Sequence, residues 1–265
     1  MTVRLQRIHE SSRGPIHVVV AGYRSRPSDA LIQSAGLRGS VYAVHWAAGK
    51  WAEAGTSVGV IARGMRVGVP ALRTGKMMLG LGSIGACAGG ALLLGAGQFR
   101  LRYGCAARDG KQLPALLADL PGIADRPVCL YGHSLGTVVI RSALETIDHD
   151  RYRIEDVVLM GGMASRLGWE PLADRFAGRL INLYSPLDRI LSIAPVWDRV
   201  VGRGEVISEI VSESVSGTEP APASGLIGRL LNHNLSDRLP SQFNAWAHHS
   251  GYWKHFGGFV DDGGL

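Results

Sequence analysis

Short apolar runs recur along the chain and are separated by polar or helix-like sequence. Each run is four to seven residues long, is rich in β-branched residues and ends at or near a turn-forming residue. This pattern is typical of strands buried on both faces of a parallel sheet. The predicted strands are Ile16–Gly22, Val41–Trp46, Val128–Tyr131, Val157–Met160 and Leu180–Tyr184.

An amphipathic helix is predicted between two of these runs. In the segment Thr137–Ile147, the residues Val139, Ala143 and Ile147 recur at the four-residue spacing of one helical face. Alternation of strands with helices indicates an α/β layered fold. We therefore expect a parallel sheet flanked by helices.

One long apolar segment interrupts this alternation. Met77–Phe99 contains no charged residue, and as a helix it would be about 34 Å long, against a hydrocarbon core of about 30 Å. Its glycines include a GxxxG pair, Gly85 and Gly89, as closely packed membrane helices often have. The segment contains many glycines, however, and glycine weakens an isolated helix. We therefore divide the chain into a core, residues 1–54 and 100–265, and an apolar Gly/Ala-rich helical insertion, residues 55–99.

The insertion cannot cross a bilayer once. A single crossing would leave Ile16–Gly22 and Val128–Tyr131 on opposite sides of the membrane, where they could not share a sheet. A paired crossing would need Thr56–Arg73, whose three arginines are costly at mid-bilayer depth. A membrane-associated hairpin that keeps these arginines among anionic headgroups and a water-soluble cap over the site both remain open.

Composition narrows the class of protein. With 46% apolar and 19% charged residues the chain can bury a sizeable core, which excludes a mainly disordered protein. The 28 Lys and Arg outnumber the 22 Asp and Glu, and the net charge of +6 suits an anionic membrane surface as a partner. The sequence contains no basic run with interleaved aromatic residues, so it does not predict nucleic-acid binding. The three cysteines lack metal-ligand spacing, so we expect no metal, no disulfide framework and no cofactor.

A strand-to-helix turn carries the candidate nucleophile. Gly132–Gly136 reads GHSLG and matches G-x-S-x-G, a tight turn that exposes a serine. Gly55–Gly59 matches as well, but its Ser57 follows a polar stretch, whereas Ser134 follows an apolar strand and opens an amphipathic helix. Gly80–Gly85 matches the dinucleotide pattern G-x-G-x-x-G, but no clear strand precedes it and no acidic residue follows at the required distance. We therefore favour Ser134.

A serine nucleophile needs a base, and the base needs an orienting carboxylate. In a hydrolase built on this turn the chain order is serine, acid, histidine. Asp188, in YSPLD after the last predicted strand, is the preferred acid; it could instead cap a turn after Pro186, and Asp198 is the second choice. The base is expected on a loop near the C-terminus, where His249 is preferred because Ser-Gly-Tyr follows it, with His248 as the chief competitor.

Two backbone N–H groups must stabilise the oxyanion. One is expected from Leu135, directly after the serine, and the other from Tyr23, in the loop after the first predicted strand. Gly22 would let that loop approach the serine closely. His133 is interpreted as a packing residue of the turn.

Several segments resemble a known family, the α/β-hydrolase-like transmembrane and coiled-coil domain proteins. The resemblance is carried by VVVAGY, AARDGKQLPALLADL, VCLYGHSLGTVVI, IEDVVLMGGMAS, GRLINLYSPLD and HSGY, and it spans most of residues 16–256. It implies a hydrolase core with an apolar helical insertion. It also implies that Ser134 and Asp188 occupy triad positions and that His249 is the base.

These observations predict a serine hydrolase that cleaves ester or thioester bonds of a hydrophobic acyl or lipid substrate. The alternative is a non-catalytic, membrane-associated protein on a hydrolase scaffold. The first twenty residues lack the apolar core and cleavage site of a secretory signal, so we expect association with the cytoplasmic side of a membrane, or a soluble cytoplasmic protein. The head group, the acyl chain length and the choice between hydrolysis and acyl transfer stay open.

Overall fold

The computed structural model describes residues 3–22, 36–47, 100–148, 150–192, 200–206, 225–226 and 228–256 of the 265-residue chain. The chain divides into two compact units, Met1–Ala47 with Cys105–Leu265, and Ala48–Gly104. Of the second unit only residues 100–104 are described, and they are helical. The predicted insertion, with Ser57 and the G-x-G-x-x-G match, lies outside the described residues. The fold described below is that of the first unit.

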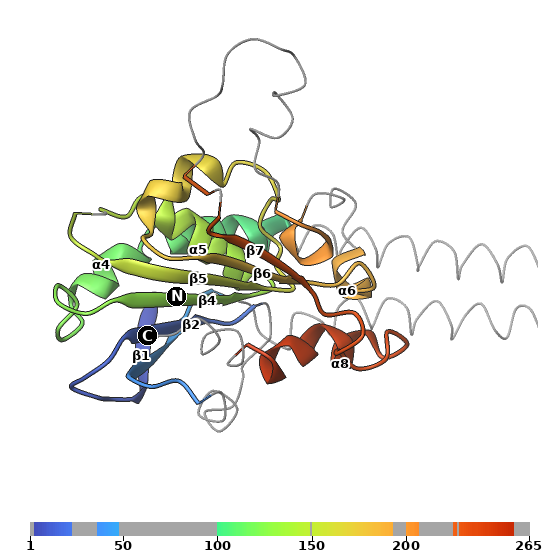
Figure 1. The fold of residues 1–265 in the computed structure, drawn as a ribbon, viewed down its shortest axis with the longest axis horizontal. Helices are drawn as coiled ribbons and strands as arrows, with labels where there is room; N and C mark the ends of the chain where they lie inside the picture. The colour runs from blue at the N-terminus through green and yellow to red at the C-terminus, as the bar shows by residue number, and fades with distance from the viewer. Residues whose placement is uncertain are drawn as a thin grey trace, which may run out of the picture. The chain divides into compact units, whose positions relative to one another are not determined.

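A seven-stranded sheet forms the centre of this unit (Figure 1). Its strand order is β1-β3-β2-β4-β5-β6-β7; β1 is antiparallel to β3, and every other neighbouring pair is parallel. The strands are β1 (Arg4–His9), β2 (Ile16–Val20), β3 (Ser40–His45), β4 (Val128–His133), β5 (Ile154–Met160), β6 (Leu180–Tyr184) and β7 (Leu230–Asn234).

The five strands predicted from apolar runs are the five inner strands, β2 to β6. The two strands that the pattern did not predict lie at the two edges of the sheet. The edge strand β1 is mostly exposed and β7 is half-buried along most of its length. An edge strand covers little of the core and needs no continuous apolar run. The expected parallel sheet is therefore correct for the interior and wrong at β1.

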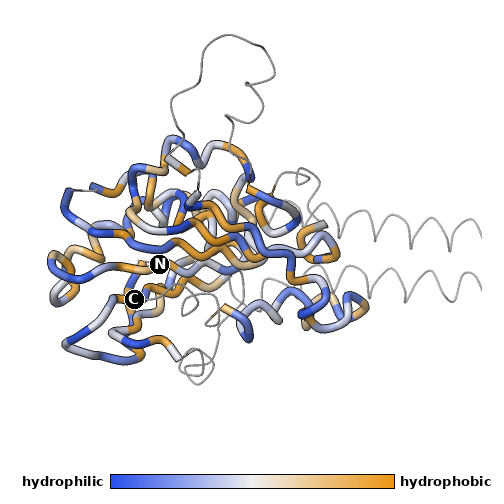
Figure 2. Tube along the Cα trace, viewed as in Figure 1, coloured by the Kyte–Doolittle hydropathy of each residue, from blue (hydrophilic) through white to orange (hydrophobic). Residues whose placement is uncertain are grey.

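Helices flank the sheet on both faces, and the central strands between them are strongly hydrophobic (Figure 2). Alternate residues of a strand face opposite sides: Tyr131 of β4 packs with Tyr252 and Trp253 of the C-terminal segment, whereas a Cβ on the next residue, Gly132, would meet Ile140 of α5. The helices of this unit include α4 (Leu113–Ala118), α5 (Gly136–Leu144), α6 (Arg189–Ser192) and α8 (Ala245–Ser250), and the 3-10 helices η2 (Glu170–Arg175), η3 (Val201–Arg203) and η4 (Gly251–Lys254).

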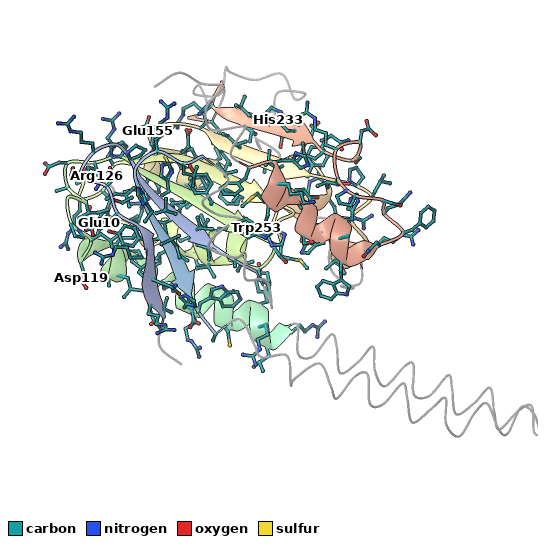
Figure 3. The ribbon with its side chains drawn as sticks, turned by 90° about the horizontal axis from the view of Figure 1, so that it is seen from below. Glu10, Asp119, Arg126, Glu155, His233 and Trp253 are labelled. Atoms are coloured by element: carbon teal, nitrogen blue, oxygen red, sulfur yellow. The ribbon has the colours of Figure 1, made fainter. Side chains whose placement is uncertain are left out.

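The two ends of the sheet differ in what surrounds them. Arg126, just before β4, and Glu155, near the start of β5, lie at the end of the sheet away from α8 (Figure 3). The helix α8 lies toward the carboxyl ends of the strands. In the described ranges, no helix combines the length and apolar character that crossing a membrane requires.

Candidate active site

Ser134 occupies a strained turn at the carboxyl end of β4. Its φ is 54°, and it is the sole non-glycine residue with positive φ in the described part of the chain. The Ser134 N–H donates to the Met160 carbonyl (3.0 Å), and its carbonyl accepts from the Thr137 hydroxyl (2.7 Å) and N–H (3.1 Å). Backbone strain of this kind persists where surrounding bonds over-determine it, and such positions cluster at functional sites.

Glycines allow the backbone of β2 to approach this turn. Val20 pairs with Gly132, so Gly22 and Ser134 each lie two residues beyond the paired positions. A Cβ on Gly22 would lie 2.5 Å from the Ser134 Cβ, and a Cβ on Gly136 would lie 2.1 Å from the Val20 carbonyl oxygen. Side chains at these positions would displace the serine or the helix that follows it. The sequence interpretation of Gly22 as a close-approach position fits this geometry.

The sheet topology also favours this location for a site. From β2 the chain continues to β3 on one side of β2, and it later returns to β4 on the other side. In open α/β sheets, ligands bind outside the carboxyl ends of the strands at such a switch point. Ser134 and Gly22 both lie there.

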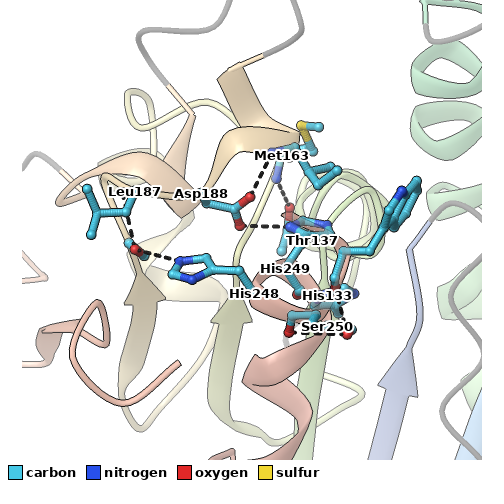
Figure 4. A network of polar contacts seen from close by, with 12 residues as sticks. His133, Thr137, Met163, Leu187, Asp188, His248, His249 and Ser250 are labelled. Atoms are coloured by element: carbon cyan, nitrogen blue, oxygen red, sulfur yellow. Dashed lines mark hydrogen bonds and ion pairs between the residues drawn. The ribbon is translucent and has the colours of Figure 1, made fainter. Parts of the chain in front are cut away.

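Asp188 and His249 meet although 61 residues separate them (Figure 4). The His249 Nδ1 is 2.8 Å from the Asp188 Oδ2, and both side chains are buried. Because a carboxylate oxygen only accepts, Nδ1 carries a proton, and a neutral ring in this tautomer has its lone pair on Nε2, as a general base needs. The Asp188 Oδ1 accepts from the Ile190 N–H (3.1 Å). Asp188 therefore also caps the turn that begins α6, which is its second sequence interpretation.

His249 lies in a helix and not on the expected loop. Asn244 begins α8, and its side-chain Oδ1 accepts from the Ala247 N–H (3.1 Å), a typical N-cap bond. The turn-like Ser-Gly-Tyr that followed His249 in the sequence continues as the 3-10 helix η4. The helix fixes the direction of the imidazole more firmly than a loop would.

His133 links the base to the serine. Neither the Ser134 Oγ nor the His249 Nε2 has a hydrogen-bond partner among the described residues. The link runs through His133, next to the serine, whose Nε2–H donates to the His249 carbonyl (2.8 Å) and whose ring centroid lies 4.7 Å from that of His249. Hydrogen bonds between base and nucleophile often form only when substrate binds. His133 thus contacts the segment of His249 directly, which its sequence interpretation as a packing residue did not include.

Burial keeps His133 neutral. Desolvation, followed by the nearby His249, lowers the pKa of His133 from 6.5 to about 3. Its Nδ1 is buried and has no hydrogen-bond partner among the residues that the structure describes. A protonated ring here would place a second positive charge against His249 whenever the base accepts a proton.

The competing histidine, His248, makes a different set of contacts. Its Nδ1–H donates to the Pro240 carbonyl (2.6 Å), and its Nε2 is 3.1 Å from the Ser185 Oγ. The Ser185 Oγ also accepts from the Leu187 N–H (3.2 Å). This buried contact joins the loop that carries Asp188 to the helix that carries the base. His248 therefore supports the site and does not contact the acid.

Tyr252 closes the site on the side of the C-terminal segment. Its ring packs edge-on to His249, with centroids 6.4 Å apart, and a Cβ on Gly161 would lie 2.5 Å from that ring. Gly161 has a φ of 48°. Burial, followed by the charge of Asp188, raises the pKa of Tyr252 well above its usual value, so the phenol stays neutral.

One predicted oxyanion donor is described. The Leu135 N–H has no hydrogen-bond partner in the described part of the chain and precedes α5, whose N-terminus favours negative charge. Tyr23, the other predicted donor, and Asp198, the second-choice acid, lie outside the described residues.

No cluster of three or more metal-ligating side chains occurs among the described residues. Desolvation raises the pKa of Cys129 to about 11, which leaves its thiol protonated and unreactive.

Sequence reasoning missed three supporting features: the hydrogen bond of His133, the pairing of Ser185 with His248, and the packing of Tyr252 against His249. Each acts through a contact between segments far apart in the chain. His133, Ser185 and Tyr252 lie within the quoted segments GHSLG, YSPLD and HSGY, but the sequence does not show which contacts they make.

The first unit is thus an α/β protein with a mostly parallel seven-stranded sheet, a serine turn at the carboxyl end of β4, and a buried Asp188–His249 pair that contacts the neighbouring His133. The model of the family described as "Protein of unknown function (DUF726)" matches residues 3–194, and the chain belongs to that family. The chain is also 40% identical over 90 residues to the transmembrane and coiled-coil domain-containing protein STS1 of Oryza sativa subsp. japonica. That alignment covers 32% of this chain and only 13% of the rice protein. No solved structure matches the chain.

Proposed function

We propose that this protein is a serine hydrolase of the α/β-hydrolase type that cleaves ester or thioester bonds of hydrophobic acyl or lipid substrates. The observation that carries the proposal is the contact between Asp188 and His249, beside a serine held at positive φ. The chain order serine, acid, histidine agrees with this class. Asp188 is buried and paired with His249, whereas an acid that faced solvent would favour the alternative of an inactive scaffold.

In the proposed reaction the Ser134 Oγ attacks the carbonyl carbon while the His249 Nε2 accepts the hydroxyl proton. The Leu135 N–H stabilises the oxyanion, with Tyr23 as the expected second donor. Collapse of the tetrahedral intermediate expels the alcohol or thiol, which takes the proton from His249 and leaves an acyl-serine. Water then attacks the acyl-serine, giving its proton to His249, and the carboxylic acid and the free serine are released.

The substrate class is inferred from the surroundings of the cluster. Leu187, next to the acid, and Trp246, one helical turn before the base, are large apolar side chains that remain exposed. Such side chains at the rim of a site favour an apolar acyl chain over a polar acyl group.

A fluorophosphonate probe tests the assignment on the full chain. The wild type should be labelled, Ser134→Ala should not, and Ser57→Ala, which removes the serine of the second G-x-S-x-G match, should be labelled like the wild type. With p-nitrophenyl esters, kcat/KM should rise as the acyl chain lengthens. An unlabelled wild type would favour an inactive scaffold, and labelling that survives in Ser134→Ala would reject this serine.

A further inference from the structure

Exposed apolar side chains gather on the two segments that carry the acid and the base. Four large hydrophobic residues are strongly exposed in the described part of the chain. Leu101 belongs to the other unit, whereas Leu187 directly precedes Asp188, and Phe243 (83% exposed) and Trp246 (57%) flank the start of α8. This is not the scatter of single apolar residues that any surface shows.

These side chains form one surface. The Arg189 guanidinium lies over the Phe243 ring, 5.6 Å from its centroid, and so joins the segment of Leu187 to that of Trp246. The helices α6 and α8, which carry Arg189 and Trp246, pack against each other. We call the four residues Leu187, Arg189, Phe243 and Trp246 the rim surface.

The exposed charges of the two segments that carry the rim surface are mostly positive. Arg189 is exposed, as are Arg238 and Lys254 in the C-terminal segment, whereas the exposed acidic residue of that segment is Asp237. The whole chain carries a net charge of +6. An anionic partner is therefore favoured electrostatically.

We propose that the rim surface docks on a phospholipid bilayer that contains anionic lipid. Aromatic side chains with an apolar body suit the membrane–water interface, where Trp is enriched, and a neighbouring Arg binds lipid phosphate. A protein partner or a second copy would have to supply a fitted pocket for each protruding ring, whereas a fluid bilayer adapts to them. The proposal goes beyond the proposed hydrolase and uses it only to explain why the surface borders the acid and base. It concerns residues outside the predicted insertion.

The test uses the full chain with Ser134→Ala, so that docking is measured without any turnover. Vesicles of phosphatidylcholine, with or without phosphatidylserine, are sedimented with the protein. The double variant Phe243→Ser/Trp246→Ser should lower the partition coefficient by about ten-fold, since burying one large apolar side chain is worth at least that factor. Leu101→Ser, which removes an exposed leucine of the other unit, should leave the partition coefficient unchanged. Arg189→Gln should weaken binding only when phosphatidylserine is present.

A second measurement decides the case if the insertion also holds the protein on the vesicles. Bromine-labelled phosphatidylcholine quenches tryptophan only at the bilayer surface, so Trp246→Phe should remove part of the quenchable fluorescence. Unchanged quenching in Trp246→Phe would overturn the proposal whatever the partition coefficient. A change of oligomeric state in Phe243→Ser/Trp246→Ser without vesicles would identify an interface between copies and would also overturn it. Neither result depends on whether Ser134 is a nucleophile.

Discussion

The neutral, buried His133 should make the stability of this protein depend on pH. In the unfolded chain a histidine takes up a proton near pH 6.5, whereas in the folded protein burial lowers the pKa of His133 to about 3. Between these values the unfolded state binds more protons than the native state, so the free energy of unfolding falls as the pH falls. The loss begins near pH 6.5 and is complete near pH 3.

The magnitude follows from the two pKa values. Between these two pKa values, the free energy of unfolding changes with pH by up to about 1.4 kcal/mol per pH unit, because the unfolded state binds one more proton than the folded state. Integrated from pH 7 to pH 5, His133 alone should remove about 2 kcal/mol from the free energy of unfolding. That is a large share of the stability of an ordinary domain.

Urea denaturation at pH 7, 6 and 5 measures this effect when the wild type is compared with His133→Gln. Glutamine does not titrate, and its amide N–H can still donate to the His249 carbonyl that His133 now contacts. The wild type should lose about 2 kcal/mol more than the variant between pH 7 and pH 5, because the other titrating groups are common to both proteins. Parallel pH dependences for the two proteins would show that His133 is not held neutral in the folded state.

Three further predictions concern the proposed reaction and are measured on full-length protein. Asp188→Asn should lower kcat by about 10³–10⁴-fold, because both carboxylate oxygens accept N–H bonds and an amide offers one acceptor. The matched control is Asp156→Asn, which changes a buried carboxylate bonded to Arg179. This control should lower stability, but the protein that remains folded should keep its kcat. Gly22→Ala should abolish probe labelling, since its Cβ would lie 2.5 Å from the serine Cβ; normal labelling would place the loop elsewhere. Ser185→Ala should cost about 1 kcal/mol of stability and lower kcat by about ten-fold with little change in KM; unchanged kcat would limit this serine to a structural role.

Sequence patterning predicted the interior of the sheet because those strands are buried on both faces. Their apolar runs are a direct consequence of that burial. The edge strands β1 and β7 escaped prediction for the same reason: each pairs on one side only and needs few apolar residues. The strand-to-helix turn at Ser134 was predictable because its glycines are required locally, by the tight backbone and by the close approach of β2.

The choice between His248 and His249 shows where the sequence reaches its limit. Consecutive residues of a helix point about 100° apart, so the two imidazoles face different partners once α8 forms. Which of them meets Asp188 depends on the rotation of α8 against the segment after β6, a contact between residues about sixty positions apart. The sequence by itself determined the layered α/β class, the serine turn and the candidate acid, since each follows from local patterning. Tertiary packing alone decided which histidine pairs with the acid, that His133 and Ser185 support the pair, and that apolar side chains surround it.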